Sequence, residues 1–387
     1  MKEGTCAFMN TSAASPAAPH HTAVNLADYA ACAESVLDAA AWAYLSGGAG
    51  DEQTLRANVL AWQRIGLLPR LLQPLAHGHT RVHLFGREWA HPIWLAPVAY
   101  QALFHPQAEL ASAVAAAAQG AGLVLSTLST TPLETVAQAI ADDAARGPLW
   151  FQLYLQGDRG ADAELIARAE AAGYEAVVLT ADAPCHGARD RERRAGFALP
   201  PGVQAAHRRP ATATPAPLPP GASALFDRLL LRAPNWDDVA WLRAQTRLPI
   251  LLKGVLHADD ARQARSLGLD GAIVSNHGGR TLDTLPPTAE RLRHVVDAVG
   301  ADWPVLVDGG IRRGTDVAKA LALGARAVLI GRPYVFGLSA AGPQGVAHVI
   351  RLLRDELEIA MALLGARTPQ DLARTHLLEP ASTPDSR

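Results

Sequence analysis

The sequence predicts a (β/α)8 barrel, the TIM-barrel fold class, and three observations support this prediction. Eight short apolar runs recur along the chain, each bounded by turn-forming or charged residues. The runs lack a regular alternation of polar and apolar residues, which is typical of parallel strands buried on both faces. Stretches rich in alanine, leucine and charged residues lie between them, and several end at glycine, as helices commonly do.

These expected strands and helices alternate along the chain. The expected strands are 93–97, 123–126, 150–154, 176–180, 250–253, 272–275, 305–308 and 327–331. The clearest expected helices are 108–122, 133–145, 163–173, 259–268 and 315–325. A doubly wound open sheet is the competing architecture. Eight strand-then-helix units in a chain of 387 residues favour the closed barrel.

No change of composition divides the chain, so residues 25–375 are expected to form a single domain. Within it, residues 25–90 are expected to supply N-terminal helices and a loop that cap one end of the barrel. Residues 1–24 lack the continuous apolar segment of a signal peptide and are expected to form a disordered tail. Residues 376–387 are expected to form a C-terminal tail.

An insertion interrupts the pattern after the fourth expected strand. Residues 202–231 contain prolines too densely for a helix or a central strand, and the next strand is expected only at Ile250. The fourth strand-to-helix loop therefore carries a Pro-rich insertion, with a mobile part at about 195–225. Such loops lie at the C-terminal face of a barrel, where active sites form. A flexible surface loop is the simpler interpretation, and a lid is the alternative.

Composition narrows the classes of partner and the compartment. There are 35 Lys+Arg against 37 Asp+Glu, so no basic excess is available to bind nucleic acid. The three cysteines are far apart and fit no metal-binding spacing, which indicates a reduced, cytoplasmic protein. The uncharged stretch between Glu109 and Glu134 contains glycine, proline, serine and threonine, which suits a helix, a strand and a loop better than a membrane span.

Polar residues, together with one glycine, end the expected strands. They are Ser126, Gln152, Tyr154, Thr180, Asp182, Lys253, Ser275, His277, Asp308, Gly331 and Arg332. Each alone has a simpler explanation, such as a helix cap for an aspartate or a solvated lysine. Because the carboxyl ends of all barrel strands meet on one face, the set as a whole predicts an active site there.

Two segments predict a phosphate site. Residues 308–314 place Gly309, Gly310 and Arg312 between a strand and a helix, and residues 330–333 follow the last strand. Barrel phosphate sites use these two loops, in which glycine lets backbone N–H groups approach the oxygens and arginine adds charge.

The remaining polar residues suit a heterocyclic ring beside that phosphate. Lys253 near the barrel centre is costly unless it faces an anion, and Gln152, Ser126 and Thr180 offer donors and acceptors for a ring edge. A phosphate at one end and a polar-edged ring at the other describe FMN. No GxGxxG motif follows a strand, so a Rossmann-bound dinucleotide is not indicated.

His277 and Arg280 lie three residues apart directly after the sixth expected strand. A guanidinium binds a substrate carboxylate bidentately, and an imidazole then acts as general base on the adjacent carbon or its hydroxyl. Asp182 is the carboxylate best placed by strand order to orient the imidazole. Tyr44, Tyr154 and Arg189 are further candidates for contacts to the carboxylate or hydroxyl.

These motifs resemble those of the FMN-dependent α-hydroxy-acid oxidase and dehydrogenase family, which includes glycolate oxidase, lactate oxidase and mandelate dehydrogenase. The likeness covers residues 25–375, and SNHGGRTLD (275–283) with DGGIRRGTDV (308–317) is highly specific. The resemblance implies FMN-dependent oxidation of an (S)-2-hydroxy acid to the 2-oxo acid, with electrons passed to oxygen or another acceptor. It also implies a homotetramer or a larger homo-oligomer. A barrel that binds a phosphate ligand without catalysis, as a sensor or scaffold, is the alternative.

The resemblance also implies roles for individual residues. His277 is then the base with Asp182 beside it; Arg280, Tyr44 and Arg189 bind the substrate carboxylate; Tyr154 contacts the hydroxyl; and Lys253 lies by the N1–O2 edge of the flavin. Residues implied to hold the cofactor are Pro97, Val98, Ala99, Ser126, Gln152, Thr180, Lys253, Ser275, Asp308, Gly309, Gly310, Arg312, Gly331 and Arg332.

The chain departs from the glycolate-oxidase pattern near the substrate. Val98 stands where that pattern often has threonine, Leu128 where it often has tryptophan, and Cys185 and Ala188 where it has basic residues. An aliphatic side chain in place of an indole leaves more room. The expectation is therefore a larger or aromatic 2-hydroxy acid in preference to glycolate.

Overall fold

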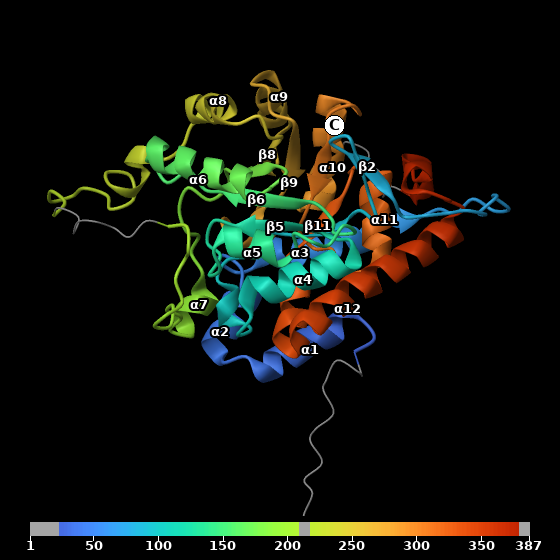
Figure 1. Cartoon of the computed structure of the whole chain (residues 1–387), viewed down its shortest axis with the longest axis horizontal. Coiled ribbons are helices and arrows are strands. Elements are labelled where there is room, and N and C mark those ends of the chain that lie inside the picture. Colours follow the sequence, from blue (N-terminus) through green and yellow to red (C-terminus); the bar gives the residue numbers. More distant parts are fainter. Residues whose placement is uncertain (1–22, 209–216, 379–387) are drawn as a thin grey trace, which may run out of the picture.

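The chain folds into a closed barrel of eight parallel strands, so the predicted fold class is confirmed (Figure 1). A computed structural model describes residues 23–208 and 217–378. Around the barrel the strands are hydrogen-bonded in the order β10-β11-β4-β5-β6-β7-β8-β9. The closing pairs, β4 with β11 and β9 with β10, are parallel like the rest.

Each barrel strand coincides with one of the predicted apolar runs. The strands are β4 (Ile93–Leu95), β5 (Gly122–Ser126), β6 (Leu149–Leu153), β7 (Val177–Thr180), β8 (Ile250–Val255), β9 (Gly271–Val274), β10 (Val305–Val307) and β11 (Val328–Ile330). Parallel registers such as Ser126 opposite Gln152 and Thr180 opposite Lys253 bring their polar C-terminal residues side by side.

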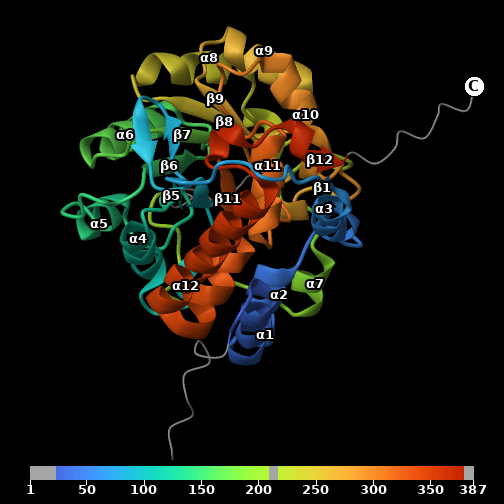
Figure 2. The ribbon, with the colours of Figure 1, turned by 90° about the vertical axis from the view of Figure 1, so that its right-hand side faces the viewer.

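Helices surround the barrel, and their bounds correct the sequence-based expectations. They are α4 (Ala108–Gln119), α5 (Leu133–Ala139), α6 (Arg159–Ala171), α8 (Trp236–Gln245), α9 (Ala258–Ser266), α10 (Thr288–Val299), α11 (Gly314–Ala322) and α12 (Arg332–Leu364). The predicted helix 133–145 ends at Ala139, and the predicted helix 163–173 begins earlier, after the N-cap Asp158. Helix α12 is kinked at Gly342 and Pro343 and packs against α4 and α1 (Figure 2).

The N-terminal segment forms the expected helices. They are α1 (Leu26–Val36), α2 (Ala39–Ser46) and α3 (Gln53–Arg64). Asn25 and Asp28 form a capping box on α1, and the Asp38 carboxylate accepts from two backbone N–H groups at the start of α2. Helix α3 packs against α10 and the turn η4 (His277–Gly279), so this segment covers the face that carries the predicted site.

A hairpin closes the other end of the barrel. It consists of β2 (Val82–Leu84) and β3 (Arg87–Trp89), which pair antiparallel. Val82, Leu84 and Trp89 pack in one cluster with side chains inside the barrel, including Trp94 and Trp150, whose rings meet edge to face at 4.5 Å. The interior is therefore filled and sealed at this end, which leaves the C-terminal face for binding.

The chain boundaries differ in part from those predicted. The predicted N-terminal tail is wrong for Ala23, which is buried, and residues 1–22 lie outside the described part. The expected C-terminal tail is wrong for 376–378, because β12 (Leu377–Leu378) pairs antiparallel with β1 (Gly66–Leu67). Residues 379–387 lie outside the described part.

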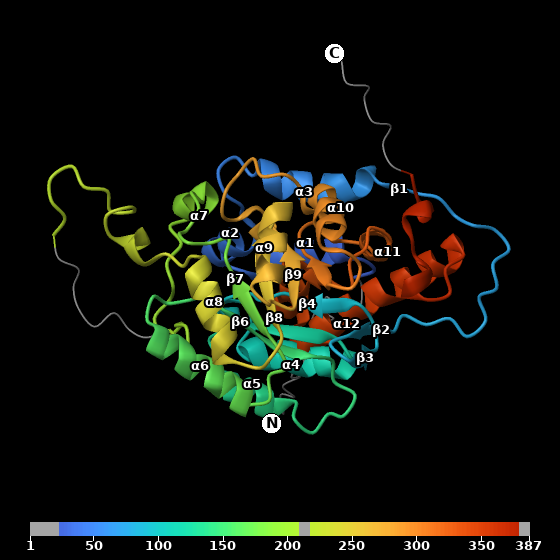
Figure 3. The ribbon, with the colours of Figure 1, turned by 90° about the horizontal axis from the view of Figure 1, so that it is seen from above.

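The insertion leaves the barrel on the side of α7 (Asp190–Arg194) and α8 (Figure 3). Its first part is anchored: the Ala206 N–H donates to the Ser129 carbonyl at 2.8 Å, and His207 is buried with its ring 5.7 Å from that of Phe151. Residues 209–216 of the predicted mobile part lie outside the described residues. The remaining short turns are η2 (Gln101–Leu103), η3 (Leu229–Arg232), η5 (Pro369–Asp371) and η6 (Arg374–His376).

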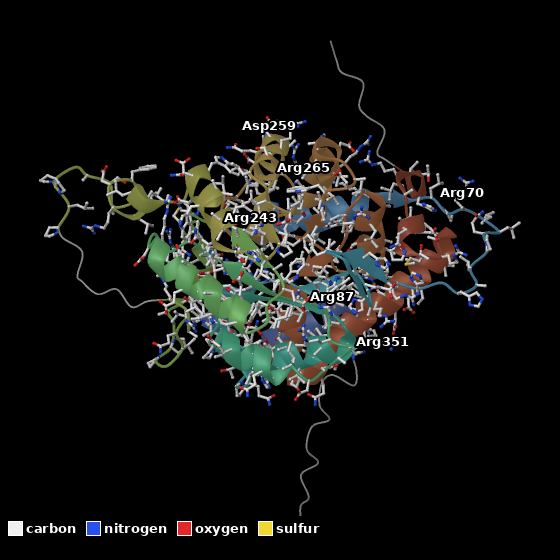
Figure 4. All side chains as sticks on the ribbon, turned by 45° about the horizontal axis from the view of Figure 1, so that its top comes forward. Arg70, Arg87, Arg243, Asp259, Arg265 and Arg351 are labelled. Carbon is white, nitrogen blue, oxygen red and sulfur yellow. The ribbon has the colours of Figure 1, made fainter. Side chains whose placement is uncertain are left out.

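Many surface charges on the covering helices are paired. Figure 4 labels Arg243, Arg265 and Arg351 on α8, α9 and α12, which form ion pairs with Asp270, Asp302 and Asp355 at 2.7–2.8 Å. Exposed pairs of this kind contribute little to stability. Among the described residues, no helix combines the length and apolarity that crossing a bilayer requires.

Buried His91 makes the fold sensitive to acid. Its Nε2 is 2.9 Å from the Gln119 carbonyl, and its Nδ1 accepts from the Ile93 N–H at 3.2 Å, an arrangement that only the neutral ring satisfies. Burial lowers the pKa of His91 to about 4 from its ordinary 6.5. The unfolded chain therefore takes up a proton first as the pH falls, and the contribution of His91 to stability is lost between pH 6.5 and about 4.

In the His91→Gln variant the free energy of unfolding is expected to depend less on pH in the acid range, because an amide does not titrate. The free energy of unfolding, measured by denaturant titration from pH 8 to 4, should fall by about 3 kcal/mol less in the variant than in the wild type. Equal pH dependence of the two proteins would show that His91 is not the titrating group.

Candidate active site

A cavity of about 1500 Å³ opens at the C-terminal face of the barrel. Its wall contains side chains from the ends of the strands and from α2, α7 and the insertion. The predicted site residues that line it are Tyr44, Pro97, Val98, Ala99, Ser126, Tyr154, Thr180, Arg189, Lys253, His277, Arg280, Asp308, Gly309, Gly310, Arg312, Gly331 and Arg332. Asp182, Gln152 and Ser275 lie behind the wall, each hydrogen-bonded to a lining residue.

His277 and Asp182 form a pair at the cavity wall. The His277 Nδ1 lies 2.9 Å from an Asp182 carboxylate oxygen, and the Tyr154 hydroxyl lies 3.5 Å from Nε2. Burial opposes ionisation of Asp182, but the neighbouring His277 and Lys253 hold the pKa of this carboxyl below its usual value. An ionised Asp182 accepts the Nδ1 proton and leaves the Nε2 lone pair of His277 free to take a proton.

Backbone geometry fixes this pair. His277 has a φ of +55°, in the left-handed region, and begins a single turn that carries the chain to Arg280. Gly254 has a φ of +107°, and a Cβ placed there would lie 2.5 Å from the Asp182 Cβ. Glycine at position 254 therefore makes the space that Asp182 occupies, a role that its place after Lys253 did not reveal.

Lys253 is buried at the centre of the site. Its Nζ is 3.0 Å from an Asp308 oxygen and donates to the Ser275 hydroxyl at 2.9 Å. Burial alone would lower the pKa of Lys253, but the carboxylates of Asp308 and Asp182 raise it above its usual value. The lysine is therefore a cation at neutral pH, fixed beside the space that the cavity offers.

The basic residues Arg280 and Arg189 meet at a third wall. The guanidinium of Arg280 lies over the Tyr44 ring, with its carbon 4.9 Å from the ring centroid, and donates to the Tyr44 and Gly47 carbonyls. Both arginines also contact Glu192, a residue that the sequence-based prediction missed. Nothing in the sequence signals the contact of Glu192 with Arg280, because the two residues lie 88 positions apart.

The segments after β10 and β11 form the predicted phosphate end. Burial lowers the pKa of Arg312 to about 10. Among the described residues, its guanidinium donates a hydrogen bond only to the Ile311 carbonyl. A buried cation without a bonded carboxylate is stabilised by a bound anion. Arg332 was expected to bind the phosphate, but its guanidinium donates to the Leu45, Gly47 and Gly278 carbonyls. Arg312 and backbone N–H groups are therefore more available than Arg332 to donate to a phosphate.

The residues present fit FMN. The buried polar atoms without a partner among the described residues include Gln152 Nε2, Thr180 Oγ1 and Asp308 Oδ1, which lie at or directly after the C-terminal ends of barrel strands. A Cβ added to Gly331 would meet only Ala96 and Val98 side chains at 4.0 Å, so the backbone there borders open space. Unsatisfied donors and acceptors at one end, and a buried arginine whose guanidinium is bonded to no carboxylate of the described chain at the other, match a polar-edged ring with a phosphate.

Comparison with known proteins agrees with this geometry. The profile of the family described as FMN-dependent dehydrogenase matches residues 33–379. The chain belongs to the FMN-dependent dehydrogenase family. Its cofactor is accordingly FMN.

Several oxidases are similar to this chain over most of its length. The chain is 49% identical over 360 residues to an L-lactate oxidase of Roseobacter sp. (strain GAI101), covering 92% of this chain and 94% of that protein. It is 46% identical to the 4-hydroxymandelate oxidase of Amycolatopsis orientalis, covering 90% and 96%. A crystal structure of mandelate oxidase with (S)-2-phenylpropionate matches with a TM-score of 0.81 and 44% identity, covering 92% of this chain and 98% of that one.

The Gly331→Val variant is expected to fold normally and to lose affinity for FMN. The added side chain meets no atom closer than 4.0 Å at Cβ, so it extends into the cavity where the cofactor has to lie. The dissociation constant of FMN, measured by fluorescence quenching, should rise at least about tenfold, while the melting temperature of the apoprotein changes little.

Gly310→Ala is a contrasting variant, in which the added methyl group meets backbone and not open space. Gly310 has a φ of +83°, and its added Cβ would lie 2.2 Å from the Asn58 carbonyl oxygen. This variant is expected to lose about 1–3 kcal/mol of apoprotein stability. A Gly331→Val protein that binds FMN as tightly as the wild type would place the cofactor elsewhere.

Proposed function

We propose that this protein oxidises an (S)-2-hydroxy acid to the corresponding 2-oxo acid, with electrons passing to oxygen or another acceptor. The observation that carries the proposal is the convergence of the His277–Asp182 pair and the Arg280–Arg189 pair on one cavity. Relatives named as lactate, glycolate and 4-hydroxymandelate oxidases support both the substrate class and oxygen as acceptor.

In this proposal the protein's own residues bind, orient and deprotonate the substrate. Arg280 and Arg189 hold the carboxylate with charge-assisted hydrogen bonds, and Tyr44 packs against Arg280. Tyr154 contacts the substrate hydroxyl, which sets the α-carbon near His277. Nε2 of His277 takes one proton, from the α-carbon or from the hydroxyl, and Asp182 stabilises the imidazolium that forms. Bound FMN supplies the two-electron acceptor for the oxidation.

The substrate is proposed to carry a larger apolar or aromatic group at the α-carbon. The apolar side chains that line the cavity include Leu128, Leu155, Phe197, Leu199, Val203 and Leu229. Leu128, the residue found in place of the tryptophan of the glycolate-oxidase pattern, is among them. A cytoplasmic location and a homotetrameric or larger assembly are part of the same proposal.

The test uses the purified FMN-loaded protein under anaerobic conditions. Mandelate, lactate and glycolate are added in turn, and bleaching of the flavin absorbance is recorded before air is admitted. We expect bleaching with recovery in air, and a higher kcat/KM for mandelate than for glycolate. A sensor or scaffold, the alternative function, would bind FMN and bleach with none of them. The intact pairing of His277 and of Arg280 favours the enzyme.

A further inference from the structure

Glu192 lies between the two arginines that are proposed to bind the substrate carboxylate. Its Oε1 is 3.1 Å from Nη2 of Arg280 and 3.3 Å from Nη1 of Arg189. The three side chains are only 13–15% exposed, and all three residues line the cavity. A carboxylate of the protein itself therefore bridges the two cations at the position where a substrate carboxylate is expected.

Arg280 retains donors for a second carboxylate. A guanidinium has five N–H donors. Within the described chain, Nη1 of Arg280 donates to the Tyr44 and Gly47 carbonyls, and Nη2 donates once to Glu192. The Nε hydrogen and one Nη2 hydrogen have no partner within the described chain, so they can donate to a second carboxylate. Glu192 thus shares Arg280 with a substrate and does not exclude it.

The charges in this cluster oppose one another. Burial lowers the pKa of Arg280, the positive charge of Arg189 lowers it further, and Glu192 acts in the opposite direction. Two guanidinium groups and one carboxylate leave a net charge of about +1, which equals in size the charge of a 2-hydroxy monocarboxylate. Without Glu192 the same walls would present about +2 to every small anion that enters.

We propose that Glu192 sets the strength of the carboxylate site, weakening it so that the 2-oxo acid product is released. This inference rests on the proposed function. Substrate and product carry the same carboxylate, so a stronger clamp binds both more tightly. Such uniform binding does not accelerate the chemical step and slows product release. Glu192 is in this sense a residue that tunes affinity, and it takes no part in proton transfer.

The test is Glu192→Gln in the FMN-loaded enzyme. Glutamine has the same size and keeps an oxygen that accepts from arginine, but it carries no charge. The probes are 2-hydroxyisobutyrate, which has no α-hydrogen and binds without turnover, and pyruvate as a 2-oxo acid product. We expect the dissociation constant of both, measured by calorimetry, to fall by about tenfold, and KM and kcat to fall together.

If Glu192 had only a structural role, the two dissociation constants would change in the opposite direction. If Glu192 only props the two arginines, its replacement disorders them and both dissociation constants rise; a rise or no change overturns the proposal. Glu192→Asp is a second variant, in which the charge is kept but withdrawn by one methylene from both arginines. Tightening of about two- to threefold is expected there, and weakening overturns the proposal as well.

Asp190→Asn is the matched control. It removes one negative charge two residues away, from a side chain that is 42% exposed, pairs with Arg193 and Arg194, and is absent from the cavity wall. Its dissociation constants should stay within twofold of the wild type; an equal tightening would assign the effect to net charge and overturn the proposal. A wild-type enzyme that no 2-hydroxy acid bleaches refutes the proposed function. Normal bleaching without tightening in Glu192→Gln refutes only the role of Glu192.

Discussion

The His277→Ala variant is expected to keep its FMN and to lose nearly all of its turnover. The rate of flavin bleaching by a 2-hydroxy acid under anaerobic conditions should fall by about 10³-fold, because a positioned general base contributes about 10²–10⁴-fold. The remaining carboxylate contacts are untouched, so the affinity for 2-hydroxyisobutyrate should stay close to that of the wild type. Stopped-flow absorbance gives the rate, and calorimetry gives the affinity.

Asp182→Asn provides the comparison for this prediction. An asparagine keeps the size of the side chain opposite Nδ1 of His277, now 2.9 Å from a carboxylate oxygen, but it removes the negative charge that stabilises the imidazolium. The expected loss in bleaching rate is about 10²-fold, at the low end of the range for proton transfer. A wild-type rate of flavin bleaching in His277→Ala would show that His277 is not the general base, regardless of the result for Asp182→Asn.

The barrel was predictable because its strands are buried on both faces. Runs such as 176–180 and 250–253 are apolar up to their last residue, and eight such runs recur along the chain, one for each barrel strand. Helix α12 escaped prediction since its segment contains Gly342 and Pro343, which break the helical pattern in sequence but only kink the helix in the structure. The end of the chain was missed because pairing of two-residue strands leaves no signature in composition.

The site was predictable to the extent that strand order determines it. Tyr154, Lys253 and His277 follow strands whose C-terminal ends meet, so their convergence follows from the fold class. Glu192 and Gly254 gain their roles from close approach between segments far apart in the chain, such as the contact of Glu192 with Arg280 across 88 residues. A single sequence carries no record of such approaches.

The Lys253→Met variant is expected to be strongly destabilised as well as inactive. Lys253 and Asp308 form an ion pair at 3.0 Å, with side chains only 5% and 9% exposed. Removing the ammonium leaves the Asp308 carboxylate buried without its counter-charge. The free energy of unfolding of the apoprotein should fall by about 3–5 kcal/mol, the usual cost of breaking a buried pair on one side. Denaturant titration at pH 7 measures it.

The double variant Lys253→Met/Asp308→Asn separates stability from function. Without the buried carboxylate most of the lost stability should return, with a coupling energy between the two sites of about 2 kcal/mol or more. Turnover should not return, because no cation then lies beside Ser275 at the centre of the cavity. If stability and turnover recovered together, the pair would be structural only. Recovery of stability without turnover would show that folding does not require the Lys253 cation. The lysine would then be needed for the chemistry of the site.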